Sequence, residues 1–253
     1  MASTGNPVWI DIYFPDPEPC EAFYGTLFGW TFEDQGPELG NYRMIRSADG
    51  RIIGGASPGI PDDENVPTDW TVHLGTDDLA KAVKRTTAAG GRVLFDPMQI
   101  GELGRVAIVA APSGASLGIW QAESFDGFEQ PLTDGTPVWF EEMSTSFDAD
   151  RDFYASVFGW ENQMMDGGLA YATNWPQDAA TAGLCDASEI FPSGTDPYWR
   201  IYFQVADVDA AMEQVTTLGG TVLDGADDSP FGRLATVADP HGNAFQIIMP
   251  PAR

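Results

Sequence analysis

The sequence contains few basic residues, and this shortage excludes whole classes of partner. Of its 253 residues, 12 are Lys or Arg against 38 Asp or Glu, a formal net charge of −26 at pH 7. Such a surface repels phosphate backbones and anionic lipid headgroups. We therefore expect no nucleic-acid partner and no binding to a membrane surface.

Cysteine and histidine are almost absent. Cys20 and Cys185 are the only cysteines, and they stand in unrelated contexts. Their spacing is neither that of a disulfide framework nor that of a zinc site, and it suits a reducing compartment. His73 and His241 are the only histidines, and His241 falls in the turn sequence DPHGN, where we expect it at the surface.

Long apolar runs are missing as well. No run approaches the about 18 residues of a membrane-spanning helix, and MASTGNP at the start lacks the basic and apolar parts of a signal peptide. We expect a cytoplasmic protein. The apolar fraction of 43 %, with 8 Trp and 15 Phe, is ample for packed cores, which excludes a wholly disordered chain.

The sequence does contain an internal repeat, with the order of the copies kept. The offset drifts only from 130 (residue 6 to 136) to 128 (residue 104 to 232). The matched segments are NPVWIDIYFP with TPVWFEEMST, EAFYGTLFGW with RDFYASVFGW, DWTVHLGTDDLAKAV with YWRIYFQVADVDAAM, and GRVAIVAAPSGASLGIWQ with GRLATVADPHGNAFQIIM. We predict two domains, 1–123 and 136–253, joined by a polar linker at 124–135.

Within each half, strand and helix patterns alternate twice. In the first half, a strand over 8–14 precedes a helix that ends at Gly29, and a strand over 70–75 precedes a helix that ends at Gly90 and Gly91. Shorter strand-like runs follow each helix. The chain is therefore predicted to be α+β, with four units of strand, helix and strands.

This order, with FYGTLFGW and FYASVFGW at helix ends, AAGG after the second helix and DPHGNAFQI near the end, resembles the vicinal oxygen chelate superfamily. That superfamily includes glyoxalase I, extradiol dioxygenases and bleomycin-resistance proteins. The resemblance runs from about Pro7 to Pro250 and is nearest to tandem, glyoxalase-like actinobacterial proteins. It implies four βαβββ modules in two tandem domains, with curled mixed sheets around cavities.

The resemblance also implies a divalent metal, held by His or Gln on the first strand of a module and Glu on its last strand. The matching positions here are Trp9, Thr71 and Gly118 in the first half, and Trp139, Arg200 and Gln246 in the second. Indole, guanidinium and glycine are not metal ligands. A displaced site of Asp11, His73 and Glu141 would draw on both halves. We expect no metal and no cofactor.

Alternate residues of a strand point to the same face of a sheet. This alternation predicts which side chains line the concave faces in place of a metal site. The residues predicted to contact a ligand are Trp9, Tyr13, Thr71, Trp139, Met143, Tyr202 and Gln246. Aromatic walls with a few polar groups are typical of sites for flat small molecules. The residues predicted to carry catalysis are Asp11, His73, Glu141 and Arg200. Core packing, a buried hydrogen bond or an ion pair explains each of them equally well.

Three functions follow. The first is a metal-independent, glyoxalase-like protein that binds a flat, apolar molecule of secondary-metabolite or polyketide type and catalyses elimination, isomerisation or cyclisation on it by proton transfer. The alternative is a non-catalytic drug-binding protein of the bleomycin-resistance type, whose acidic surface suits a cationic drug. The third is a metal-dependent glyoxalase or dioxygenase with displaced ligands. We expect a small-molecule ligand and a monomer or homodimer.

Overall fold

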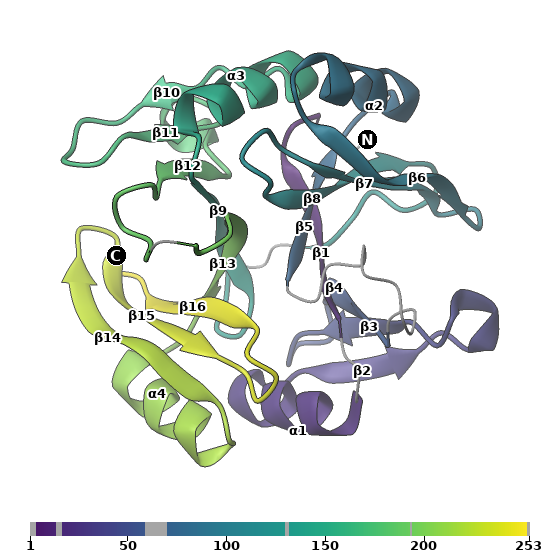
Figure 1. Ribbon diagram of the computed structural model, residues 1–253. Helices are drawn as coiled ribbons and strands as arrows, with labels where there is room; N and C mark the ends of the chain where they lie inside the picture. Colours follow the sequence, from purple (N-terminus) through teal and green to yellow (C-terminus); the bar gives the residue numbers. More distant parts are fainter. Residues whose placement is uncertain (1–3, 14–16, 59–69, 130–131, 193, 252–253) are drawn as a thin grey trace. The chain divides into compact units, whose positions relative to one another are not determined.

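The computed structural model describes residues 4–13, 17–58, 70–129, 132–192 and 194–251 (Figure 1). In the first half the elements are β1 (Pro7–Tyr13), α1 (Pro17–Phe28), β2 (Thr31–Asp34), η1 (Pro37–Leu39), β3 (Arg43–Arg46), β4 (Ile52–Ser57), β5 (Thr71–Gly75), α2 (Leu79–Ala88), β6 (Arg92–Ile100), β7 (Gly104–Ala110) and β8 (Ser116–Ala122). In the second half they are β9 (Pro137–Ser144), α3 (Phe147–Phe158), β10 (Gln163–Met164), β11 (Tyr171–Thr173), η2 (Gln177–Ala179), β12 (Gly183–Asp186), β13 (Tyr198–Gln204), α4 (Val208–Thr217), β14 (Thr221–Ser229), β15 (Gly232–Ala238) and β16 (Ala244–Met249). Each half repeats the order strand, helix, three strands twice, which confirms the predicted α+β fold of four βαβββ modules.

The strands form two mixed sheets of eight strands each. Their orders are β2-β3-β4-β1-β5-β8-β7-β6 and β10-β11-β12-β9-β13-β16-β15-β14. In each module the first strand runs parallel to the last, as in the pairs β1 with β4 and β9 with β12, and the other neighbours are antiparallel. The described helices include none that is long and apolar enough to cross a membrane.

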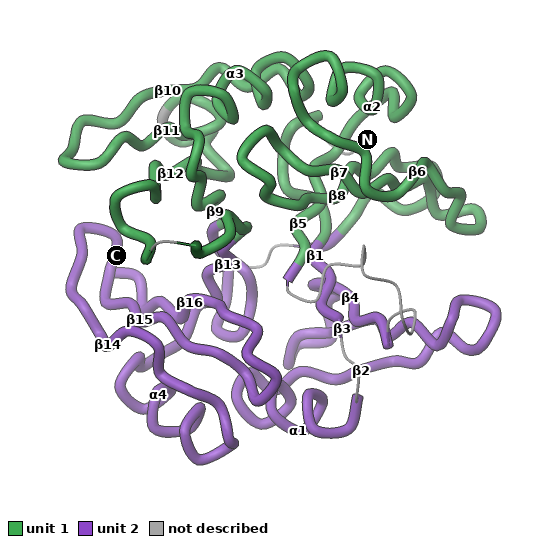
Figure 2. Tube along the Cα trace, viewed as in Figure 1, with its two compact units in different colours: residues 1–9, 71–127, 140–199 green, residues 10–70, 128–139, 200–253 purple. Residues whose placement is uncertain are grey.

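The chain divides into two compact units (Figure 2). Unit 1 comprises residues 1–9, 71–127 and 140–199, and unit 2 comprises residues 10–70, 128–139 and 200–253. Each unit thus combines one βαβββ module from each half of the sequence. The division into sequence domains 1–123 and 136–253 stays a prediction, and residues 130–131 of its linker lie outside the described residues.

Capping residues explain where the helices begin and end. Asp78 and Asp207 accept hydrogen bonds from backbone N–H groups in the first turns of α2 and α4, both at 3.0 Å. Gly159 ends α3 with a φ of 77°, a left-handed conformation that costs glycine little.

Each unit has an aromatic core that includes the Phe and Trp of one repeated FGW segment. In unit 1, Tyr154 stacks on Trp160 at 4.4 Å between ring centroids, and the Trp160 indole donates a hydrogen bond to the Gly5 carbonyl at 2.7 Å. In unit 2, the Trp30 indole donates to the Gly135 carbonyl at 2.6 Å. Each tryptophan therefore binds the segment that precedes the first strand of the other half of the sequence.

Candidate functional site

The two faces of strand β9 have different environments in unit 1. Ser144 donates a hydrogen bond to the Asp150 carboxylate in α3, so its side chain points toward that helix. Residues two apart on a strand share a face, which places Glu142 on the helix side as well. Glu141 and Met143 therefore occupy the opposite face, as the period-two reading predicts.

Apolar and aromatic side chains cluster on that opposite face. Met143 pairs in register with Cys185 on β12, and both are buried together with Ala187. The half-buried rings that pack against this cluster are Tyr171, Phe191 and Tyr198. Phe191 and Tyr198 stack with 5.8 Å between centroids and 11° between planes. This face of unit 1 presents aromatic surface next to the Glu141 carboxyl.

Tyr171 reaches over strand β12, which lies between its own strand β11 and the strand β9 that carries Glu141. Gly183 on β12 pairs in register with Glu141, and Tyr171 lies on β11, the next strand outward. A Cβ atom on Gly183 would overlap the Tyr171 hydroxyl and lie 2.5 Å from its Cζ atom. The hydroxyl end of the Tyr171 ring therefore lies over Gly183, on the side of β11 toward the strand that carries Glu141.

Unit 2 repeats this arrangement. Asp11 on β1 pairs in register with Gly55 on β4, and Tyr42 directly precedes β3. The Tyr42 hydroxyl donates a hydrogen bond to Asp11 Oδ1. A Cβ atom on Gly55 would overlap that hydroxyl and lie 2.7 Å from Tyr42 Cε1. A carboxylate and a tyrosine thus flank a glycine in both units.

The predicted site residues are distributed over both units. Unit 1 contains Trp9, Thr71, His73, Glu141 and Met143, and unit 2 contains Asp11, Tyr13, Trp139, Arg200, Tyr202 and Gln246. The two predicted catalytic pairs, Asp11 with His73 and Glu141 with Arg200, each have one member in each unit. Both pairings stay predictions.

Individual predicted residues have definite surroundings within their own units. Trp9 is buried and meets Phe125 edge to face, with ring centroids 5.1 Å apart. Gln246 is buried, and its Nε2 atom donates to Thr236 Oγ1 at 2.7 Å. Its neighbour across the parallel pair β13–β16 is Tyr202. These contacts give Trp9 and Gln246 structural roles, whatever else they contact.

The residues at the superfamily's metal positions do not fit a metal ion. The first-strand positions carry indole at Trp9 and Trp139, which offers a donor N–H and no lone pair for a metal. At Gly118 the buried His73 ring fills the space, because a Cβ atom there would collide with it. Within the described parts of the chain, no three His, Cys, Asp or Glu side chains lie close enough together to hold a metal ion.

Sequence reasoning missed a buried acid pair in unit 1. Glu142 and Asp150 are both 0 % exposed. Asp150 accepts from the Ser113 backbone N–H at 2.9 Å, and the Ser113 hydroxyl binds Glu142 Oε1 at 3.2 Å. Burial raises the pKa of the Glu142 carboxyl well above its usual range, and the charge of Asp150 raises it further. Both effects favour the protonated, neutral form of Glu142.

Unit 2 replaces this pair with a different acid. There the Tyr24 hydroxyl donates to Asp239 Oδ2 at 3.1 Å, whereas the aligned residue Tyr154 of unit 1 lies beside Glu142 and Asp150. Burial, followed by the neighbouring acid, raises the pKa of the Tyr24 hydroxyl well above its usual range. The buried acid thus comes from the β15–β16 turn in one unit and from β9 and α3 in the other, which indicates a structural role.

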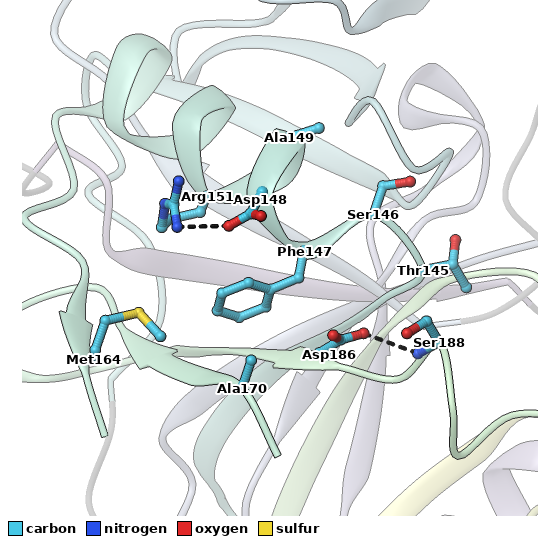
Figure 3. Close-up of a pocket in the computed structure, with 10 residues that line it drawn as sticks. All are labelled: Thr145, Ser146, Phe147, Asp148, Ala149, Arg151, Met164, Ala170, Asp186 and Ser188. Atoms are coloured by element: carbon cyan, nitrogen blue, oxygen red, sulfur yellow. Dashed lines mark hydrogen bonds and ion pairs between the residues drawn. The ribbon is translucent and has the colours of Figure 1, made fainter. Parts of the chain in front are cut away.

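A shallow pocket of about 450 Å³ lies on unit 1 where α3 begins (Figure 3). Phe147, Asp186 and Arg151 are among its lining residues. The Arg151 guanidinium forms ion pairs with Asp148 at 2.7 Å and with Asp152 at 2.9 Å. None of the side chains drawn in Figure 3 belongs to the predicted site.

Comparison with known proteins gives the family. The model of the glyoxalase-like domain matches twice, over residues 8–119 and 123–248. The chain belongs to the glyoxalase-like domain family. This confirms the resemblance to the vicinal oxygen chelate superfamily.

Relatives of known name align over almost the whole chain. The anthracycline biosynthesis protein DnrV of Streptomyces peucetius is 32 % identical, with 96 % of this chain and 93 % of that protein covered. The protein CFP32 of Mycobacterium bovis is 30 % identical, with 97 % and 95 % covered.

Solved structures of a dioxygenase and of a glyoxalase share the fold. The 2,3-dioxygenase LapB of Pseudomonas sp. KL28 has a TM-score of 0.66 at 13 % identity, over all of this chain and 94 % of that one. The Mn(II)-bound glyoxalase of Novosphingobium aromaticivorans has a TM-score of 0.63 at 11 % identity, over 98 % and 83 %. At these identities the similarity concerns the fold alone.

Two tyrosines of the site were absent from the sequence prediction. Tyr42 precedes Gly55 by 13 residues, and Tyr171 precedes Gly183 by 12. A tyrosine followed at this distance by a glycine, in both halves, is a signal that the internal alignment contains. It becomes informative only when the strand register shows that the glycine pairs with the acid.

Proposed function

We propose that this chain binds a flat, largely apolar small molecule of secondary metabolism and moves a proton on it without a metal ion. The observation that carries the proposal is the set of residues at the superfamily's metal positions. Trp9 and Trp139 stand where the first-strand ligands would be, and Gly118 stands where a last-strand Glu would be. Neither indole nor glycine supplies an electron pair for a metal.

The relatives support a ligand class. DnrV and DauV, both named as anthracycline biosynthesis proteins, each align with 96 % of the chain at 32 % identity. Anthracyclines are planar hydroxyquinones of polyketide origin, and aromatic side chains bind such rings by stacking. The stacked pair of Phe191 and Tyr198 near Met143 supplies aromatic surface of this kind in unit 1. A planar hydroxyquinone is therefore the proposed ligand.

Proton transfer suits the two acids Asp11 and Glu141. Asp11 and Glu141 recur at equivalent places in the two halves, and a carboxylate removes a proton from a carbon or oxygen acid that lies next to a carbonyl. His73 and Arg200 are the further residues proposed to take part in catalysis. Elimination, isomerisation and cyclisation of a hydroxyquinone need only this transfer and correct positioning.

A second candidate is a sequestering protein without catalysis, as in bleomycin resistance. The net charge of −26 favours it for a cationic drug, because an acidic surface attracts such a ligand over long range. In either case the proposed location is the cytoplasm, and the proposed assembly is a monomer or homodimer.

Binding and turnover separate the two candidates. We would titrate the protein with 1,4-dihydroxyanthraquinone by tryptophan fluorescence, and follow mixtures with planar polyketide hydroxyquinones by liquid chromatography and mass spectrometry. An enzyme variant Asp11→Asn or Glu141→Gln keeps its affinity and loses rate, whereas a binder shows no product with any variant. Failure of every hydroxyquinone to bind would contradict the proposed ligand class, and with it the first candidate.

A further inference from the structure

In each unit, a tyrosine side chain reaches over the strand that separates it from the strand of the acid. This strand is β4 in unit 2 and β12 in unit 1. Neighbouring strands lie about 4.8 Å apart, so a side chain that reaches the second strand away must cross the one between them. Tyr42 crosses β4 to bind Asp11 on β1, and Tyr171 crosses β12 toward the strand of Glu141. In both cases the residue beneath the phenol is a glycine.

The glycines are necessary for this geometry. A Cβ atom on Gly55 would overlap the Tyr42 hydroxyl, and one on Gly183 would overlap the Tyr171 hydroxyl. Neither glycine has a positive φ, so backbone conformation does not demand glycine there. The space for the phenol explains both glycines.

The acid is more exposed to solvent in unit 2 than in unit 1. Asp11 and Tyr42 are both half-buried, whereas Glu141 is 6 % exposed beneath a half-buried Tyr171. A ligand therefore reaches the carboxylate of unit 2 more readily than that of unit 1.

We propose that Tyr42 is a positioning residue that orients Asp11 as the proton acceptor for a phenolic or enolisable ligand, and that Gly55 exists to admit it. This inference rests on the proposed function for its ligand class. Because the Tyr42 hydroxyl binds Oδ1, it fixes the plane of the carboxylate relative to the sheet. A fixed carboxylate plane presents its lone pairs to the ligand in one direction.

The proton step balances without an oxidant or a metal. An O–H bond of the ligand, or a C–H bond next to its carbonyl, breaks, and the proton forms an O–H bond on the Asp11 carboxyl group. The electron pair stays on the ligand as a phenolate or enolate. Return of the proton to another ligand atom restores Asp11 and completes an isomerisation.

The test uses the full chain and 1,4-dihydroxyanthraquinone, whose visible spectrum changes when a phenol loses its proton. The variants are Asp11→Asn, Tyr42→Phe and Gly55→Ala. The control is Gly225→Ala, since a Cβ atom on Gly225 meets nothing within 4 Å. Thermal unfolding confirms that each variant folds, and Tyr42→Phe is the conservative change should Gly55→Ala fail to fold. Dissociation constants and the pH midpoint of the bound probe's colour change are then measured.

We expect the wild-type carboxylate to accept a hydrogen bond from the bound phenol and to oppose its ionisation. The midpoint should therefore fall in Asp11→Asn by about one pH unit or more, and by a smaller amount in Tyr42→Phe and Gly55→Ala. The affinity of these two variants should stay close to that of the wild type, as expected for Asp11→Asn, and Gly225→Ala should match the wild type in both measurements.

Two other outcomes would overturn the inference in distinguishable ways. If the probe binds and Tyr42→Phe keeps the wild-type midpoint, Tyr42 has no positioning role, and the proposed function stands. If the wild-type protein does not bind the probe at all, the proposed ligand class is wrong, and the inference fails with it.

Discussion

The Tyr42 hydroxyl donates a hydrogen bond to the Asp11 carboxylate across strand β4, directly over Gly55. Tyr171 crosses β12 over Gly183 in the same way, toward the strand of Glu141. Duplication of the module has therefore kept an acid, a phenol and a glycine together in both units. Because this combination recurs while the metal donors are missing, it is the part of the site from which testable expectations follow most directly.

The bond between Tyr42 and Asp11 should contribute measurably to folding. We expect Tyr42→Phe and Asp11→Asn to destabilise the protein in a non-additive manner, with a coupling free energy of about 1 kcal/mol. Urea unfolding of the two single variants and the double variant measures this coupling. Additive free energies of unfolding would show that the two side chains do not interact in solution.

Gly183 of unit 1, the equivalent of Gly55, should tolerate a Cβ atom as poorly as Gly55 does. Gly183→Ala should lower the free energy of unfolding by about 1 to 3 kcal/mol, because the methyl group must displace Tyr171. Gly168→Ala, where a Cβ atom meets nothing within 4 Å, is the matched control and should change stability by less than about 0.5 kcal/mol. Equal behaviour of the two variants would mean that Tyr171 does not lie over Gly183.

Glu142 should make stability depend on pH. Its pKa is raised in the folded protein above the ordinary 4.5, chiefly by burial and then by Asp150. The folded state therefore holds this proton more tightly than the unfolded chain, and the stability that it contributes below pH 4.5 is lost as the pH rises through the folded pKa. Glu142→Gln should remove this fall, which amounts to at most about 1.4 kcal/mol per pH unit.

The pH experiment compares urea unfolding of the wild type, Glu142→Gln and the control Glu161→Gln from about pH 4 upward, because the fall in stability begins near the ordinary pKa of 4.5. Glu161 is exposed, so its variant should follow the wild type throughout. A pH-independent difference between the wild type and Glu142→Gln would contradict the raised pKa.

The paired tryptophans should stabilise the two units alike. Trp30→Phe and Trp160→Phe each remove an indole N–H that donates to a glycine carbonyl, at 2.6 Å from Gly135 and 2.7 Å from Gly5. Each change should lower the free energy of unfolding by about 1 to 3 kcal/mol. A loss in only one of the two variants would show that the two units do not use the motif in the same way.

The fold was readily predicted because its signals are local. Repeated FGW helix ends and the glycines after each helix mark the elements, and the internal repeat shows that the same order of elements occurs again. Strand period also placed Glu141 and Met143 on one face of β9, opposite Ser144 and its bond to Asp150.

The contacts of the site were harder to predict because they depend on strand register. Nothing in the local sequence shows that Gly55 pairs with Asp11, or that a tyrosine from beyond β4 fills the space above it. The Glu142 pair was missed for a related reason. From the sequence alone, Glu142, directly after Glu141, is expected to face solvent. Only the packing of α3 shows that it is buried beside Asp150.

Binding of 1,4-dihydroxyanthraquinone with and without added Mn²⁺ tests the central proposal most directly. Protein dialysed against EDTA should bind the probe with the same dissociation constant before and after Mn²⁺ is added, and Asp11→Asn should change the spectrum of the bound probe in both conditions. Binding that appears only after Mn²⁺ is added would contradict the proposal, because the ligand would then require a metal that the residues at Trp9, Trp139 and Gly118 do not explain.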